Sequence, residues 1–224
     1  MSIYSVAVDG PSGAGKSTLS KAVARELGIV YVDTGAIYRT IGYYIFREGI
    51  DPKDAGAVVA ALPLIHVDMC YSEDGLQHML LNGEDVTEQI RLPEISMYAS
   101  AVSAIPPVRD YLLEMQRDMA RRSSVIMDGR DIGTVIMPDA DCKLFVIASA
   151  EARAKRRYKE LCEKGQECTY EEVLRDIEAR DRNDREREIA PCVPADDAII
   201  FDNSELDFDG TVEAALALIG EKTK

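Results

Sequence analysis

The sequence predicts an α/β fold in which helices cover both faces of a parallel sheet. Short apolar runs alternate with segments whose apolar residues recur at helical spacing, which is typical of such sheets. A glycine-rich stretch, GPSGAGKST, follows the first run and opens the first helical pattern. Two segments interrupt the alternation, and they predict an inserted hairpin and a charged pair of helices.

Five apolar runs are the candidate strands of this sheet. They cover residues 3–8, 29–32, 125–127, 144–148 and 198–201. Two apolar stripes at helical spacing predict helices that pack on the sheet, with methionine as core filler. The stripes are Val108, Leu112, Met115 and Met119, and then Val212, Ala215, Leu216 and Ile219.

The first interruption predicts an inserted β-hairpin. Residues 64–71 and 76–82 are strand-like runs, and the turn-forming residues SEDG at 72–75 join them. The two histidines, His66 and His78, fall in this hairpin. We expect both side chains to be solvated rather than to ligate a metal.

The second interruption predicts two highly charged helices. Residues 151–188 hold 11 of the chain's 26 lysines and arginines, together with 12 acidic residues. A turn at 164–166 separates the two helices, and Thr169 with Glu172 forms a capping box that starts the second.

The stretch GPSGAGKST fits the phosphate-binding pattern G-x-x-x-x-G-K-[ST]. A glycine-rich turn between a strand and a helix directs backbone N–H groups and the positive end of the helix dipole into one concavity. Lys16 can reach the β and γ phosphates of a nucleotide, the Ser17 hydroxyl can join the shell of Mg²⁺, and Gly28 fits the end of the helix. The predicted nucleoside triphosphate site consists of Gly10, Pro11, Ser12, Gly13, Ala14, Gly15, Lys16, Ser17 and Thr18.

Composition argues against several classes of function. The formal net charge of −14 opposes binding to nucleic acids and to anionic membranes, which rely on surplus lysine and arginine. No apolar run approaches the roughly 20 residues of a membrane span, and the first residues lack a signal-peptide pattern. We expect a cytoplasmic monomer with neither a nucleic-acid nor a membrane partner.

The cysteines predict reduced thiols, because they are odd in number and scattered. Cys162 and Cys168 are close in sequence, but no second pair or nearby histidine completes a tetrahedral metal site. The full set is Cys70, Cys142, Cys162, Cys168 and Cys192.

Three arginine-bearing motifs offer the positive charge that phosphoryl transfer requires, since guanidinium binds phosphate through two parallel hydrogen bonds. DTGAIYR, which ends in Arg39, and DGRDIGT, which holds Arg130 beside Asp131, each follow a candidate strand. Open α/β sheets bind ligands at that end of their strands. The run ARDRNDRER at 179–187 closes the charged region, and taken alone it is more often a solvated charged face.

Together the motifs resemble the bacterial cytidylate kinases, a family of nucleoside monophosphate kinases. DGPSGAGKST, DTGAIYR, NGEDVTEQIR, DGRDIGTV and RDRNDRER followed by APCVPADDA occur in family order over nearly the whole chain. The resemblance implies transfer of the γ-phosphate of ATP to CMP or dCMP in pyrimidine nucleotide metabolism, with Mg²⁺ as cofactor.

The same resemblance implies a three-layer P-loop kinase fold. Its parts are a core with a five-stranded parallel sheet, an inserted antiparallel β part that binds the nucleoside monophosphate (NMP), and a helical lid. The implied boundaries are 1–38, 106–150 and 189–224 for the core, 39–105 for the NMP-binding part and 151–188 for the lid arm.

The resemblance also assigns residues to the acceptor nucleotide. They are Arg39, Arg130 and Arg187 for the CMP phosphate, Thr34, Ser100, Arg109 and Asp131 for the base and its surroundings, and Arg180 with Asp184 for the sugar hydroxyls. On the donor side, Arg153 and Arg157 are the lid partners of the ATP phosphates, while surface charge is an equal reading for Arg156. The implied catalytic set is Lys16, Arg130, Arg157 and Arg187.

Alternatives stay open at the level of sequence. The acceptor could be UMP, AMP or shikimate, and Asp131 could simply orient Arg130 by a local ion pair. A GTP-binding switch would require an N-K-x-D motif, but Asn82, Asn183 and Asn203 are followed by Gly, Asp and Ser. A catalytically silent binding module is disfavoured by Lys16 and the complete arginine set.

Overall fold

The computed structural model describes residues 3–72, 75–163 and 165–223. The chain forms two compact units, which we call the sheet unit (Met1–Tyr31 with Ser123–Lys224) and the insert unit (Val32–Arg122). The division into core, NMP-binding part and lid arm stays a prediction.

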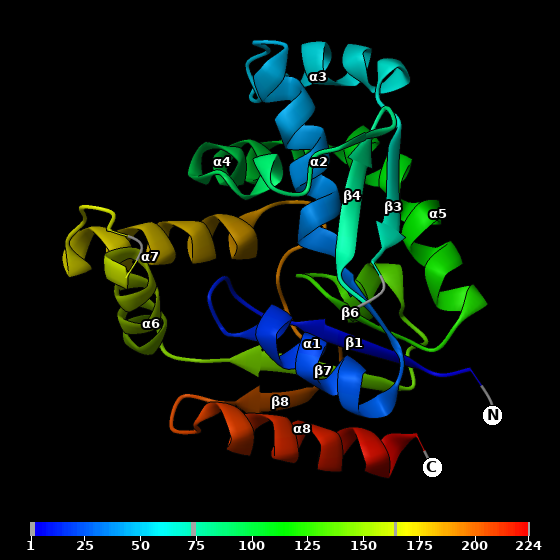
Figure 1. Cartoon of the computed structure of the whole chain (residues 1–224), viewed down its shortest axis with the longest axis vertical. Helices are drawn as coiled ribbons and strands as arrows, with labels where there is room; N and C mark the ends of the chain where they lie inside the picture. Colours follow the sequence, from blue (N-terminus) through cyan, green and yellow to red (C-terminus); the bar gives the residue numbers. More distant parts are fainter. Residues whose placement is uncertain (1–2, 73–74, 164, 224) are drawn as a thin grey trace. The chain divides into compact units, whose positions relative to one another are not determined.

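A five-stranded parallel sheet forms the centre of the sheet unit (Figure 1). β1 is the middle strand, and its Val8 lies opposite Asp128 of one neighbouring strand and Leu144 of the other. All five predicted strands are confirmed, with shifts of at most two residues at their ends. In spatial order the strands are β2 (Val30–Asp33), β6 (Val125–Asp128), β1 (Ser5–Asp9), β7 (Cys142–Ile147) and β8 (Ile199–Asp202).

Two helices, α1 (Lys16–Leu27) and α8 (Phe208–Lys222), pack together against this sheet (Figure 1). Leu19 and Val23 of α1 and Ala215 and Ile219 of α8 share one apolar cluster with the inward side chains of the central strands. Gly28 ends α1 in the left-handed conformation, as predicted. This packing fixes the start of α1, where the phosphate-binding loop lies.

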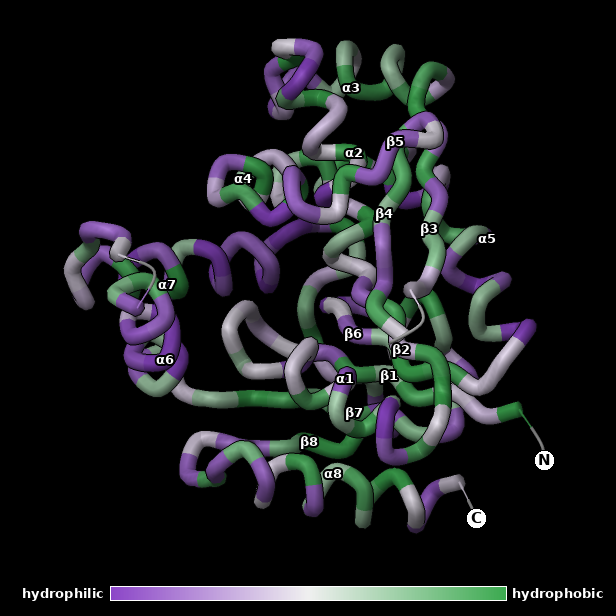
Figure 2. The backbone as a smooth tube through the Cα atoms, in the orientation of Figure 1, coloured by the Kyte–Doolittle hydropathy of each residue, from purple (hydrophilic) through white to green (hydrophobic). Residues whose placement is uncertain are grey.

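The predicted charged pair of helices is confirmed as α6 (Ala150–Glu163) and α7 (Tyr170–Glu186), which pack on each other. Figure 2 shows how strongly hydrophilic both helices are. Their small apolar contact involves Ala154, Val173 and Ile177. The capping box of Thr169 and Glu172 is present, whereas Lys164 of the predicted turn lies outside the described residues.

The insert unit combines helices with a separate three-stranded antiparallel sheet. The predicted hairpin is confirmed, and Glu73 and Asp74 of its turn lie outside the described residues. Its third strand, β5, has only two residues and gave no periodic signal. The elements are α2 (Thr34–Arg47), α3 (Ala55–Ala61), η1 (Leu62–Leu64), β3 (Val67–Tyr71), β4 (Gln77–Leu81), β5 (Glu84–Asp85), η2 (Gln89–Arg91), α4 (Pro93–Val102) and α5 (Pro106–Arg122).

The cysteines, the hydropathy of the helices and the two histidines were also the subject of expectations. All five cysteines carry free thiols, as predicted. No helix in the described part of the chain is long and apolar enough to cross a membrane. His66 is exposed and His78 half-buried, and Nδ1 of His78 lies 2.9 Å from Oδ2 of Asp85, so this histidine has a carboxylate partner.

The close packing of α2 on α4 generates a stability prediction. A Cβ added to Gly42 would lie 2.8 Å from the backbone nitrogen of Ala99. Backbone cannot yield as a flexible side chain does, so we expect Gly42→Ala to lower the free energy of unfolding by about 1 to 3 kcal/mol. Urea denaturation measures the change.

Gly220→Ala is the matched control, because Gly220 lies in α8 with no atom within 4 Å of the added Cβ. Here the higher helix propensity of alanine should raise stability by roughly 0.5 to 1 kcal/mol. Equal effects of the two substitutions would contradict the packing argument.

Candidate active site

The phosphate-binding loop has the backbone that its glycines predict. Gly10, Gly13 and Gly15 have φ values of 140°, 75° and 85°, where side chains are disfavoured. A Cβ on Gly10 would lie only 2.0 Å from the carbonyl oxygen of Val146, so no other residue fits there. The loop leads directly into α1, whose first N–H groups and dipole favour an anion.

Lys16 lies folded within this loop. It is 5% exposed, and its Nζ donates to the carbonyl oxygen of Pro11 at 2.8 Å. Burial, followed by the charge of Arg130, lowers the pKa of Lys16 to about 7, while the charge of Asp128 acts in the opposite direction. The ammonium therefore sits in an environment that favours the approach of further negative charge.

Ser17 and Asp128 bring two oxygen groups together at the start of α1. The Ser17 hydroxyl donates to Oδ2 of Asp128 at 2.6 Å. The hydroxyl of Tyr31 donates to Oδ1 of the same carboxylate at 3.0 Å. Hydroxyl and carboxylate oxygens are the ligands that Mg²⁺ prefers.

Arg130 is held by a buried carboxylate of α7. Its Nε donates to Oδ2 of Asp184 at 2.8 Å, and its Nη1 donates to the carbonyl oxygen of Gly129 at 3.1 Å. Burial alone would raise the pKa of Asp184, but the charge of Arg130 and the hydrogen bond from it lower the pKa below the ordinary value. The charge of Arg180, four residues earlier on α7, acts in the same direction.

Arg187 lies just beyond the end of α7 and faces Asp131. The two side chains approach to 3.7 Å, with exposed fractions of 10% and 5%. Arg187 also donates from Nε to the carbonyl oxygen of Ala190 at 2.6 Å. Two residues of the run 179–187 thus form largely buried ion pairs, Asp184 with Arg130 and Arg187 with Asp131. This part of the run is therefore not a solvated charged face.

The three arginines of α6 differ sharply in their surroundings. Arg153 is 4% exposed; its Nη1 donates to the carbonyl oxygen of Ser12 at 2.9 Å, and both terminal nitrogens bind Asp181. Arg157 is 46% exposed and pairs with Glu160 one turn later.

Arg156, for which surface charge was an equal reading, is anchored instead. Its Nη2 donates to the backbone oxygen of Asn203 at 2.9 Å. The Asn203 side chain is buried, and its Nδ2 donates to the carbonyl oxygen of Ala14 at 2.9 Å. Helix α6 is thus tied to the phosphate-binding loop through Ser12 and through Ala14.

In the insert unit, Thr34 and Arg39 lie on α2. Asp33 caps this helix by accepting from the backbone N–H of Ala36 at 2.9 Å, and Thr34, its first residue, is buried. Arg39 donates from Nη1 to Oγ of Ser96 at 3.0 Å.

Ser100 and Arg109, also in the insert unit, are joined through Ser103. Oγ of Ser103 donates to the backbone oxygen of Ser100 at 2.9 Å, and Nη1 of Arg109 donates to the backbone oxygen of Ser103 at 3.1 Å. The guanidinium of Arg109 lies 5.5 Å from the ring centroid of Tyr38, a cation–π contact. The structure therefore brings these two predicted residues into one cluster.

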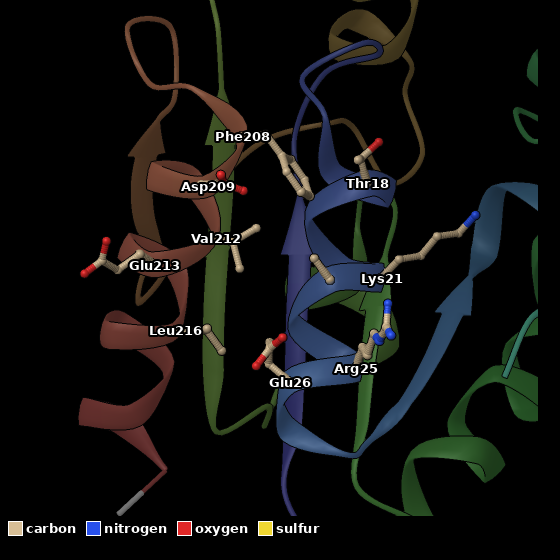
Figure 3. Close-up of a pocket in the computed structure, with 10 residues that line it drawn as sticks. Thr18, Lys21, Arg25, Glu26, Phe208, Asp209, Val212, Glu213 and Leu216 are labelled. Atoms are coloured by element: carbon tan, nitrogen blue, oxygen red, sulfur yellow. The ribbon is translucent and has the colours of Figure 1, made fainter. Parts of the chain in front are cut away.

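A separate groove of about 720 Å³ opens between α1 and α8 (Figure 3). Val212 and Leu216 of α8 line it together with Ala22 of α1, and Phe208 lies at one end. Of the predicted phosphate-binding residues, Thr18 lines this groove. The groove is therefore distinct from the arginine and carboxylate cluster described above.

Sequence reasoning missed four residues that hold the site: Asp9, Asp128, Asp181 and Asn203. Asp9 and Asp128 end β1 and β6 and are the first residues of DGPSGAGKST and DGRDIGT, and this position was the signal available. The partners of Asp181 and Asn203 depend on how helices pack, which no short motif encodes. Among the described residues, no group of three or more His, Cys, Asp or Glu side chains could hold a metal ion.

Comparisons with known proteins agree on one family. A family model described as "Cytidylate kinase" matches residues 6–221. The cytidylate kinase of Caldicellulosiruptor bescii is 46% identical, with 100% of this chain and 99% of the relative covered. That of Thermosipho melanesiensis is 44% identical, with 98% of each chain covered.

Among solved structures, an uncharacterized protein from Eubacterium ventriosum has a TM-score of 0.53 at 11% identity, covering 98% of this chain and 99% of its own, which shows a likeness of fold alone. The matches in sequence extend over the phosphate-binding loop, the strand-end motifs and helices α6 and α7 alike. The chain belongs to the cytidylate kinase family.

Proposed function

We propose that this chain transfers the γ-phosphate of ATP to CMP or dCMP, giving ADP and CDP or dCDP. The observation that carries the proposal is the cluster of Arg130 and Arg187, each paired with a carboxylate, in which the charge of Arg130 acts on Lys16 of the phosphate-binding loop. Membership of the cytidylate kinase family supports the choice of acceptor.

ATP is proposed to bind through its phosphates to the loop of residues 10–18. The backbone N–H groups and Lys16 would hold the β and γ phosphates. The neighbouring oxygens of Ser17 and Asp128 fit Mg²⁺. The sequence indicated Ser17 for this ion, and we add Asp128. When bound, the ion would neutralise charge on the phosphates.

CMP is proposed to bind through three groups of residues. Two arginines of the sheet unit and Arg39 would hold its phosphate, and the buried Asp131 would accept from the amino group of cytosine. The complete set is Arg39, Arg130 and Arg187 for the phosphate, Thr34, Ser100, Arg109 and Asp131 for the base, and Arg180 with Asp184 for the sugar.

Catalysis on this proposal requires no nucleophilic side chain, since the attacking atom is an oxygen of the CMP phosphate. The protein orients the two phosphates and neutralises the charge of the transferred group. Asp184 binds Nε of Arg130 and thereby fixes the plane of its guanidinium. Lid residues Arg157 and Arg153 would act on the ATP phosphates and exclude water, with Arg157 the more exposed of the two.

The first prediction of this proposal is a substrate profile. With ATP and Mg²⁺, a panel of nucleoside monophosphates and shikimate should show the highest kcat/KM for CMP and dCMP. A coupled assay of ADP release measures it. Faster turnover of AMP, GMP or shikimate would overturn the acceptor assignment.

Lys16→Ala and Arg130→Ala should both lower kcat by about a hundredfold or more, because each removes charge from the reacting phosphates. Calorimetry should separate their roles, with ATP affinity reduced by the first and CMP affinity by the second. Arg25→Ala is the control on the exposed face of α1 and should change neither. The reverse pattern of affinities would contradict the assigned roles.

Asp131→Asn should narrow the preference for CMP over UMP. A carboxylate favours the amino group at position 4 of cytosine, whereas an amide can rotate to offer a donor to the carbonyl of uracil. The loss of discrimination should be about 1 to 3 kcal/mol, measured as the ratio of the two kcat/KM values.

The alternative for Asp131 is a purely orienting role, and the structure places its ion pair on Arg187. In that case both substrates should slow by the same factor and the ratio should not change. Asp139→Asn, on an exposed position of the same connection, is the control and should leave both rates unaltered.

A further inference from the structure

The carboxylate of Asp9 is a buried group to which the sequence assigned no role. It ends β1, immediately before Gly10, and is 4% exposed. Its Oδ1 accepts from the backbone N–H of Ile132 at 2.8 Å, and its Oδ2 accepts from that of Gly133 at 2.7 Å. One carboxylate thus accepts from two consecutive N–H groups at the start of the helical turn Ile132–Ile136. Ile132 is 123 residues from Asp9 along the chain.

These bonds complete a tether that begins one residue earlier on β1. The backbone N–H of Gly129 donates to the carbonyl oxygen of Val8 at 3.0 Å. Residues 129–133 are therefore fastened at both ends to two consecutive residues of β1. Arg130 and Asp131 lie between these hydrogen-bonded positions. They are the residues proposed to bind the CMP phosphate and the base.

Space around the tether is limited. A Cβ on Gly133 would lie 3.2 Å from Cδ of Lys143 and 3.4 Å from Oδ2 of Asp9. The side chain of Lys143 therefore packs tightly against this glycine, while the carboxylate of Asp9 lies at ordinary contact distance. A longer or displaced acid would lose one of the two bonds.

We propose that Asp9 is a positioning residue that fixes Arg130 and Asp131 in register with the phosphate-binding loop. The inference rests on the proposed function. Both N–H donors belong to the acceptor-side segment, so losing the carboxylate should disturb CMP more than ATP. A misplacement of about 1 Å can cost on the order of a hundredfold in rate.

Asp9→Asn tests the proposal, because an amide keeps one acceptor oxygen but turns an N–H group toward the second donor. We expect kcat/KM for CMP to fall by about tenfold or more and the CMP dissociation constant to rise, while ATP affinity by calorimetry stays within about twofold. Hydrogen exchange should quicken at Ile132 and Gly133 and remain unchanged in α1.

Asp141→Asn is the matched control. Asp141 also accepts a backbone N–H of β1, that of Ser5 at 2.7 Å, but at the opposite end of the strand. Its substitution should leave CMP and ATP binding unaltered. If Asp9→Asn fails to fold, Asp9→Glu, which keeps the charge but displaces the carboxylate from Ile132 and Gly133, should weaken CMP binding in the same selective manner.

A second readout follows from the charge of Asp9. Burial raises the pKa of Asp9 to about 6, against the two backbone hydrogen bonds that lower it. Between about pH 4 and pH 6, the carboxyl group of Asp9 is protonated in the folded state and ionised in the unfolded state. Ionisation of Asp9 therefore destabilises the folded protein in this range. The unfolding free energy of the native protein, minus that of Asp9→Asn, should fall as the pH rises through this window. The titratable groups that face Asp9 are Asp131, Lys16, Cys192 and Lys143.

The outcomes are separable. Unchanged CMP kinetics in folded Asp9→Asn, or equal losses of CMP and ATP affinity, would overturn the positioning role and leave the proposed function standing. Absence of CMP phosphorylation by the unaltered protein would overturn the proposed function itself.

Discussion

The parallel pairing of β1 with β6 is the constraint on which the rest of the site depends. Its register sets Val8 opposite Asp128, so the two strands end at the same edge of the sheet. The phosphate-binding loop leaves one strand and the segment with Arg130 leaves the other. Lys16 of the loop and Arg130 of the second segment are therefore neighbours by topology, and the charge of Arg130 contributes to the lowered pKa of Lys16.

Helix α7 supplies the counter-charges that such a concentration of arginine requires. Asp181 and Asp184 are three residues apart and share one side of the helix, where they bind Arg153 and Arg130. Removing charges from water is costly unless each finds a partner. The helix is thus hydrophilic in composition, yet two of its charged side chains form ion pairs that hold the site together. Because Arg153 also reaches Ser12, helices α6 and α7 and the phosphate-binding loop share one network.

The strands and the phosphate-binding loop could be predicted from the sequence because their signals are local. Apolar runs marked every strand of the parallel sheet, and the glycines marked the positive φ values that the loop adopts. The two-residue strand β5 has no such period. The ion-pair partners of the arginines could not be predicted from the sequence either. A local ion pair of Arg130 with Asp131 was a reasonable alternative, but Arg130 pairs with Asp184, 54 residues away. Such pairings depend on sheet order and helix packing, neither of which follows from spacing along the chain.

The burial of Lys16 and Asp9 disfavours their charged forms. Burial and Arg130 make the charged form of Lys16 less favourable, and burial and Asp131 do the same for Asp9. A fold selected for stability alone would replace these groups by apolar residues, since buried charges seldom stabilise a protein. On the proposed function, phosphates would reverse the balance for Lys16 because they add negative charge where positive charge is in excess. The carboxylates meanwhile hold the backbone and the guanidinium groups in place, so bound nucleotides would relieve the electrostatic strain without collapse of the site.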